Sequence, residues 1–489
     1  GIVLTLAGPL LGDEGLLTTA VIAGGATMLA SAAVPSALRA GTLLGGGAFA
    51  LPGTVWALTG AVPGVIGPLE WLSEPWSHTL DRVAGELYLG PTTWPPLSGS
   101  WAAVGALGAI AVIGAGLGAH RRVLLGISSA AIGLLAAVTP LVAGTSVLVT
   151  LAVTVITAVL LLLAGAAVDR RRLQWAWAVL PGAAIAAVPA TGWAASSAAG
   201  SVVALAVFTL AAGAAAVLAR TGMRAVAAAL AALSIVAFAG VTARAAGAGI
   251  APAGFTAALA AGAVALVGVY LLRAQPAPRA AVEGVAALAV IVGIAVAASS
   301  TTWLAGTFSA LVPVAVIAAL SVDRRVGYGV AAAGLALCSV WAWLAAVRVG
   351  VVEAYTAPAA AAALAAGIIG WRNVPGRSWL TLGPALVLGI GPTLAIGIAD
   401  DDPVRLVVSA VLSTAAVLVG ALRRLQAPLC LGAAALIALG IDQWGDDLVR
   451  MPRWITLGVA GMVLMWIGAT FEHRRRNWRR ASEVIAHFG

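Results

Sequence analysis

The sequence predicts an all-α membrane protein: a polytopic transmembrane helix bundle of about 17–18 spans, built from helical hairpins and carrying one long extracytoplasmic loop. Three observations lead to this class. Hydrophobic residues make up 62% of the 489 residues and charged residues only 9%, whereas soluble domains carry about 25% charged residues. The mean hydropathy of +1.05 is too high for a water-soluble core. Apolar runs as long as a bilayer is thick follow one another along the chain.

Seventeen apolar segments have roughly the length that a helix needs to cross a bilayer. Their backbone groups must be paired internally, and they lack the alternation of barrel strands, so each is predicted to be a helix. In order, the segments are 15–37, 41–62, 101–119, 123–143, 146–168, 173–192, 199–219, 224–243, 253–272, 280–299, 303–321, 326–347, 356–371, 379–399, 404–422, 427–441 and 454–471.

These segments divide the chain into four parts. N-terminal transmembrane helices (1–62) precede the extracytoplasmic loop (63–100), and a transmembrane hairpin array (101–473) precedes a basic tail (474–489). The first residues are already apolar, which favours a truncated first span and a longer native N-terminus.

The placement of arginine predicts the orientation. Alternate connections hold 21 of the 27 arginines, and the remaining connections hold 13 of the 18 carboxylates. By the positive-inside rule, the arginine-rich turns and the C-terminus are cytoplasmic and the 63–100 loop is extracytoplasmic, in a bacterial inner (plasma) membrane. From Arg121 onward the arginine turns recur about every fifty residues, which fits either a duplicated two-helix unit or the length that two spans require.

The charge and the motif content exclude several classes of function. The net charge of +9 is explained by the arginine turns, so membrane lipids and not nucleic acid are the expected partners. Cys338 and Cys430 lie inside apolar runs, and the four histidines have no metal spacing. No phosphate-binding loop, GxSxG or HExxH motif is present, so no catalytic residue, metal or cofactor is assigned.

The loop from Pro63 to Trp101 is the one long interruption among the spans, and it collects acidic and tryptophan residues. Ser77 to Tyr88 is predicted to form a short amphipathic helix lying flat on the outer surface. The loop is interpreted first as an interfacial anchor and second as a site for a sugar or lipid-linked headgroup. Its candidate binding residues are Glu70, Trp71, Glu74, Trp76, Asp81 and Glu86.

A second candidate region lies near the C-terminal spans. The pairs Gly383-Pro384 and Gly391-Pro392 are predicted to break one span twice, as in transporters whose broken helices bind substrates or ions. The aspartates that follow could ligate a divalent cation, although a kinked packing helix and a solvated acidic turn are simpler alternatives. Glu353 lies near a span end with only Arg348 nearby in sequence, either as a site residue or as a boundary cap. The candidates here are Glu353, Tyr355, Gly391, Pro392, Asp400, Asp401 and Asp402.

The last third of the chain resembles a group of uncharacterised polytopic integral membrane proteins of high-GC actinobacteria. The resemblance covers about residues 350–480 and is carried by segments in matching order and spacing. It implies a source and a topology but no reaction, because the group has no assigned activity. The segments are Glu353-Ala-Tyr-Thr-Ala-Pro358, Trp379 with Gly383-Pro384-Ala385, Arg423-Arg424-Leu-Gln-Ala-Pro-Leu429, Pro452-Arg453-Trp454 and Gly468-Ala-Thr-Phe-Glu472.

Three classes of function remain open from the sequence. The first, which is favoured, is transport or flipping of a lipid or lipid-linked cell-envelope intermediate through a cavity that opens outward near the long loop. The second is a non-catalytic scaffold or accessory subunit that binds a protein partner in a membrane complex. The third is a polyprenyl-phosphate-dependent, glycosyltransferase-like enzyme at the outer face.

Overall fold

The computed structural model describes residues 18–84, 100–118, 122–169, 173–220, 222–321, 325–373 and 378–450, with four isolated positions at 458, 461, 462 and 465. Within these residues the chain forms helices joined by turns, and its only β-type pairing is one isolated bridge between Val83 and Ser146. The all-α prediction is therefore confirmed. The helices belong to two compact units, Gly1–Ala332 and Ala333–Gly489, and each is described by itself.

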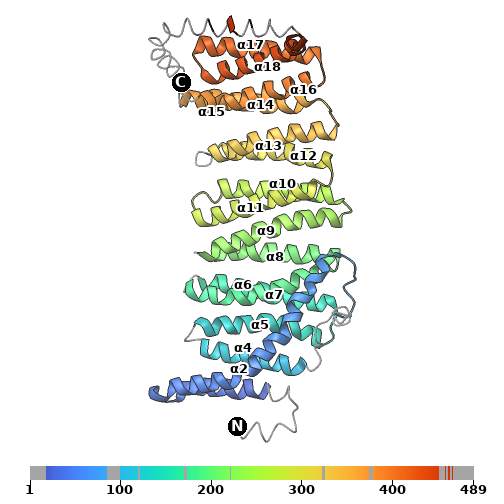
Figure 1. Ribbon diagram of the computed structural model, residues 1–489. Coiled ribbons are helices and arrows are strands. Elements are labelled where there is room, and N and C mark those ends of the chain that lie inside the picture. The colour runs from blue at the N-terminus through green and yellow to red at the C-terminus, as the bar shows by residue number, and fades with distance from the viewer. Residues whose placement is uncertain are drawn as a thin grey trace. The chain divides into compact units, whose positions relative to one another are not determined.

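Most of the long helices follow the predicted spans to within a few residues, because in this chain the apolar runs are bounded by charged or turn-forming residues (Figure 1). The exceptions are the first span, predicted as 15–37 and observed as Thr18–Ala30, the second, predicted as 41–62 and observed as Ser36–Ile66, and the span predicted as 427–441, whose helix runs on to Arg450. Unit 1 contains the helix Thr18–Ala30, η1(Ser31–Ala33), α2(Ser36–Ile66), η2(Gly67–Leu72), α4(Ser100–Gly118), α5(Arg122–Val142), α6(Val147–Asp169), α7(Leu173–Ala195), α8(Ala198–Leu218), α9(Gly222–Ala245), α10(Ile250–Tyr270), α11(Pro276–Ala297), α12(Thr301–Ala319) and the start of α13(Arg325–Ala346). Unit 2 contains the rest of α13, α14(Val352–Asn373), α15(Ser378–Thr381), α16(Gly383–Ala399), α17(Pro403–Arg423) and α18(Gln426–Arg450).

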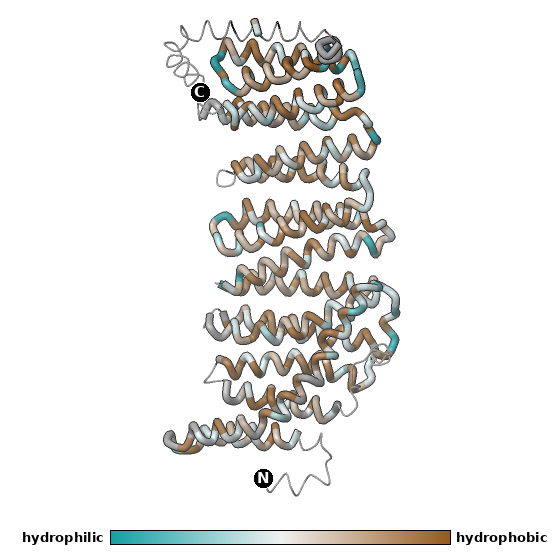
Figure 2. Tube along the Cα trace, viewed as in Figure 1, coloured by the Kyte–Doolittle hydropathy of each residue, from teal (hydrophilic) through white to brown (hydrophobic). Residues whose placement is uncertain are grey.

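Twelve of the described helices are long and apolar enough to cross a membrane, and three shorter apolar helices accompany them. Figure 2 shows that the hydrophilic residues gather in the turns at the helix ends, while the helix bodies are hydrophobic. This distribution is the one that a bilayer requires.

Most of the described helices that an arginine-bearing turn joins pack against each other as hairpins. In unit 1 these pairs are α4/α5, α6/α7, α8/α9 and α10/α11, and in unit 2 they are α14/α16 and α17/α18. Within unit 1, adjacent hairpins pack through α5/α7, α6/α8 and α9/α10, so the hairpins lie side by side in chain order (Figure 1). Arg224 links two such turns, because its Nη1 donates to Gln275 Oε1 at 3.2 Å.

Small residues permit this close helix packing. A side chain on Gly182 of α7 would collide with the Ser129 carbonyl of α5, and Ser129 Oγ donates to Ala178 O at 2.8 Å. A Cβ on Gly293 of α11 would lie 2.9 Å from the Ala258 Cβ of α10. Lipid supplies little hydrophobic force between helices, so close van der Waals contact and such hydrogen bonds hold the hairpins together.

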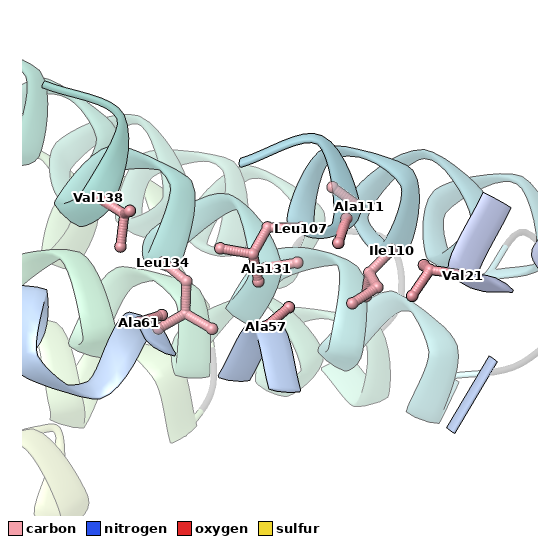
Figure 3. Packing of buried hydrophobic residues seen from close by; sticks show 10 residues of the cluster. Val21, Ala57, Ala61, Leu107, Ile110, Ala111, Ala131, Leu134 and Val138 are labelled. Atoms are coloured by element: carbon pink, nitrogen blue, oxygen red, sulfur yellow. The ribbon is translucent and has the colours of Figure 1, made fainter. Parts of the chain in front are cut away.

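Helix α2 runs obliquely across the first hairpins of unit 1 (Figure 1). Its Ala57 and Ala61 pack with Leu107 of α4 and Leu134 of α5 in the first hydrophobic cluster (Figure 3). At 31 residues it is about 46 Å long, well beyond the roughly 30 Å of a hydrocarbon core. The helix ends at η2, which packs on α7, so the segment that follows η2 begins near the C-terminal end of α7.

The segment after η2 corrects one prediction. Ser77–Val83 is not helical and consists mostly of turns and bends, whereas Ala84 is helical and residues 85–88 lie outside the described residues. The backbone pairs instead with two interhelical turns. His78 N donates to Ser196 O at 3.1 Å, and Val147 N donates to Arg82 O at 2.8 Å. These tertiary hydrogen bonds satisfy backbone groups that a helix would have paired internally.

Candidate functional site

Trp76 is held in an unusual backbone conformation at the C-terminal end of α7. Its φ is 65°, in the left-handed region, which is rare for a bulky residue and costs about 1–2 kcal/mol. Trp76 N donates to Ala195 O at 2.8 Å, and Trp76 Nε1 donates to Ser201 Oγ at 3.1 Å. Ser201 is fixed in turn, because its Oγ donates to Ala194 O at 2.8 Å. Strain of this kind persists only where the surroundings enforce it, and it often marks a functional position.

Arg244 lies beside Trp76 and comes from the last turn of α9. Its Cζ lies 5.7 Å from the centroid of the Trp76 ring, within the range of a cation–π contact. One of its N–H groups, on Nη1, donates to Ala248 O at 2.9 Å, and the side chain is exposed. Among the residues that the structure describes, no carboxylate forms an ion pair with Arg244. Its charge is therefore not neutralised by an acidic side chain of that part of the chain.

Trp76 and Arg244 line a cavity of about 360 Å³ whose walls are otherwise largely apolar. Leu205 and Phe208 of α8 line the cavity together with Ser201, and Thr191 of α7 also lines it. A positive charge, an indole and two hydroxyl-bearing residues thus line a largely apolar space at the helix ends. We call this constellation the Trp76–Arg244 site. Such a site suits a molecule with an anionic head and an apolar body, because the guanidinium pairs well with phosphate or carboxylate.

The other loop candidates are placed differently from Trp76. Trp71 packs edge-on against His78, with ring centroids 4.6 Å apart, and it also packs on the cluster that contains the fully buried Trp193. Trp71 therefore supports the segment that carries Trp76 and does not line the cavity.

The acidic residues of the loop form no described site. Glu70, Glu74 and Asp81 are exposed, and none of them lines the cavity. A hydrogen bond with the Thr79 side chain lowers the pKa of Asp81. Glu86 lies outside the described residues.

In unit 2 the structure brings together three of the predicted acidic residues around Arg405. Arg405 Nε lies 2.7 Å from Glu353 Oε1 and 3.7 Å from Asp402 Oδ2, and its Nη1 lies 3.5 Å from Asp400 Oδ2. Asp402 also caps α17, because its Oδ1 accepts from the backbone N–H of Val404 at 3.0 Å. We call these four charged residues the Arg405 cluster. The carboxylates bind a side chain of the protein itself, and no described group of acids, histidines or cysteines has the geometry to hold a metal.

Two further candidates of unit 2, Asp401 and Tyr355, lie at helix ends or in turns. Asp401 is exposed and has a φ of 49° at the end of α16. The Tyr355 hydroxyl donates to Val349 O at 3.0 Å, and Tyr355 O accepts from Trp341 Nε1 at 2.7 Å. These bonds fix the turn between α13 and α14.

The predicted double break of the span is only half right. The helix is interrupted at Leu382, between α15 and α16, next to the predicted Gly383-Pro384 break. It continues without interruption through Gly391 and Pro392, so the prediction of a second break is wrong. A proline removes one hydrogen bond from a helix, and neighbouring helices can support the helix around it. Neither residue lines a described cavity.

Three residues of these sites were missed by sequence reasoning: Ser201, Arg244 and Arg405. Each has one partner that is distant in sequence, which no local pattern reveals: Trp76 for Ser201 and Arg244, and Glu353 for Arg405. One signal was present for the arginines. Only six of the 27 arginines, Arg82, Arg244, Arg348, Arg405, Arg450 and Arg453, lie on the acid-rich connections. An arginine placed against the general bias is a candidate for a specific role.

The apolar helices and the polar groups gathered at their ends define a multi-pass integral membrane protein of all-α architecture. Comparisons with protein-family models, with curated proteins and with solved structures find no match to the chain.

Proposed function

We propose that this protein binds an anionic amphiphile at the Trp76–Arg244 site and serves in the transport or flipping of a lipid or lipid-linked cell-envelope intermediate. The observation that carries the proposal is Arg244, a guanidinium with no described carboxylate partner at the rim of an apolar cavity. In the proposed orientation this rim lies at the extracytoplasmic face of a bacterial plasma membrane. The lipid would be drawn from the bilayer around the protein.

The energetics of a charge near hydrocarbon support this ligand class. An arginine at the edge of the apolar phase is costly unless it is paired or reaches polar headgroups. The Ala248 carbonyl and the C-terminal end of α9 compensate part of the charge, the latter by about 0.3–1 kcal/mol. A phosphate headgroup would compensate the rest, and the Trp76 ring would hold the guanidinium in place to receive it.

The other two classes have less support. A glycosyltransferase-like reaction needs a carboxylate near its lipid substrate, and Glu70 and Glu74 lie outside the lining of the cavity. A scaffold would have no need of a strained tryptophan beside a charged arginine. It stays the alternative if the protein binds a lipid without moving it or binds none.

Native mass spectrometry of the full chain in a mild detergent tests the binding. Wild-type protein should retain anionic lipids, and Arg244→Gln should weaken the binding of added dioleoyl phosphatidylglycerol by about tenfold, the effect of losing one charge-assisted contact. Arg273→Gln is the matched control, because Arg273 is exposed, lies beyond the opposite end of α10 and lines no described cavity. Equal binding by both variants and wild type would refute the proposal.

A second measurement separates transport from binding alone. The protein is reconstituted in vesicles that contain a trace of fluorescent phosphatidylglycerol, and a membrane-impermeant quencher reports the exchange between leaflets. Transport predicts faster exchange with wild type than with Arg244→Gln. Binding without faster exchange would favour the scaffold.

A further inference from the structure

Helix α9 separates the cavity of the Trp76–Arg244 site from a second groove. This groove has a volume of about 450 Å³ and lies among α9, α10 and α11. Val241 and Arg244 line both hollows, so the same arginine borders two apolar spaces. Apart from Arg244, every residue that lines the second groove is apolar.

We infer that the ligand is a two-chain anionic phospholipid, with its phosphate at Arg244 and one hydrocarbon chain in each hollow. This inference rests on the proposed function and narrows it. A single-chain ligand such as a polyprenyl phosphate needs only one hollow. A free anion needs neither hollow.

The depth of the second groove matches one leaflet. On α9 its lining runs from Leu233 to Arg244, eleven residues apart, which is about 16 Å along a helix axis. On α11 it runs from Val285 to Val296, which is also about 16 Å. Half of a hydrocarbon core is about 15 Å. The groove thus extends from the charged end of α9 to about the middle of the membrane, as one acyl chain does.

Small residues leave the space open. The lining alternates between small positions, such as Ala237, Gly240 and Ala289, and large positions, such as Leu288 and Val292. Leu288 and Val292 are 64% and 54% exposed, so they form outer walls that no other described helix covers. A large side chain in place of Ala289 would fill the groove.

The test compares ligands and variants of the full chain by native mass spectrometry titration in detergent. The probes are dioleoyl phosphatidylglycerol, its one-chain lyso form and undecaprenyl phosphate. The variant Ala289→Phe fills the second groove, and Ala287→Phe places the same ring on the same helix at an exposed position outside the groove. Thermal unfolding confirms that both variants fold.

Wild type and Ala287→Phe should bind the two-chain lipid about tenfold more tightly than the lyso form. Ala289→Phe should remove that advantage and leave binding of the lyso form unchanged. Tighter binding of undecaprenyl phosphate than of the two-chain lipid, or equal binding of that lipid by the two variants, would overturn the inference and leave the proposed function standing. If all three lipids bind equally well to wild type and to Arg244→Gln, both the inference and the proposed function are overturned.

Discussion

Arg244 in unit 1 and Arg405 in unit 2 differ in what surrounds their charge, although each lies at the end of a long apolar helix and outside the arginine-rich turns. Arg405 has Glu353, Asp400 and Asp402 within 4 Å. Arg244 has an indole ring and a backbone carbonyl. One charge is compensated inside the protein, and the other is available to a ligand.

The helix dipole explains part of this difference. Arg405 lies in the first turn of α17, at the positive end of the helix dipole, where a cation is unfavourable without acidic partners. Arg244 lies in the last turn of α9, at the negative end, where a cation is stabilised. Arg405 therefore needs acidic partners for the fold to be stable, whereas Arg244 does not. In the proposed function, a charge left without an acidic partner, and not an acidic cluster, therefore marks the binding site.

The largest expected effect concerns the stability of the Arg405 cluster. Glu353→Gln leaves a partly buried guanidinium without its nearest partner, and the side chains of Glu353 and Arg405 are only 29% and 25% exposed. We expect a loss of about 1–3 kcal/mol in the free energy of unfolding, between the values for exposed and buried pairs. Arg348→Gln, with no described ion pair, should change it by less than about 0.5 kcal/mol.

A double-mutant cycle in a thermal or denaturant assay checks this prediction. Glu353→Gln combined with Arg405→Gln should cost less than the sum of the two single variants, because the pair is lost only once. Additive effects would mean that the contact contributes nothing. Lipid binding should be unchanged in all three variants.

The second prediction gives Arg244 a carboxylate partner, as Arg405 has. Ala248 provides the carbonyl that accepts from Arg244 Nη1, so a glutamate at this position can pair with the guanidinium. Ala248→Glu should weaken the binding of dioleoyl phosphatidylglycerol by about tenfold, since an internal carboxylate competes with the headgroup. Ala248→Gln has the same size without the charge and should bind as wild type does. Equal loss in both variants would point to a steric effect instead.

The sequence was sufficient for the helices and insufficient for the Trp76–Arg244 site, for a physical reason. Helix length and apolar character are local properties, so the predicted span 146–168 agrees with α6, Val147–Asp169. The contact between Trp76 and Arg244 depends on how α2 crosses its neighbours, which no local pattern encodes. Ser77–Val83 was mistaken for a helix because its apolar spacing was read without the two turns that pair with its backbone. At Pro392, local propensity predicted a break that tertiary packing overrides.

The third prediction tests how Trp76 is held. Ser201→Ala removes the hydroxyl that accepts from Trp76 Nε1, and Trp76→Phe removes the donor. Each should cost about 1 kcal/mol in the free energy of unfolding, the usual contribution of one hydrogen bond. Both should also weaken lipid binding severalfold, because the ring that positions Arg244 becomes mobile. The double variant should lose less free energy of unfolding than the two single variants added together, because both remove the same hydrogen bond. A loss of stability without any change in lipid binding would show that Trp76 is not part of the binding site.

The smallest expected effect is a pH dependence at Asp81, in the segment that follows Trp76. A hydrogen bond with the Thr79 side chain lowers the pKa of this carboxyl below its ordinary value, so the folded state favours the charged form. The resulting stabilisation is present above the unfolded pKa and is lost as the pH falls through the lower folded pKa. Thermal unfolding from pH 7 to pH 3 should therefore show wild type slightly more stable than Asp81→Asn at neutral pH, with the two converging on acidification. Because Asp81 is exposed, the difference should be far smaller than that caused by Glu353→Gln, and a gap that widens on acidification would contradict the assigned hydrogen bond.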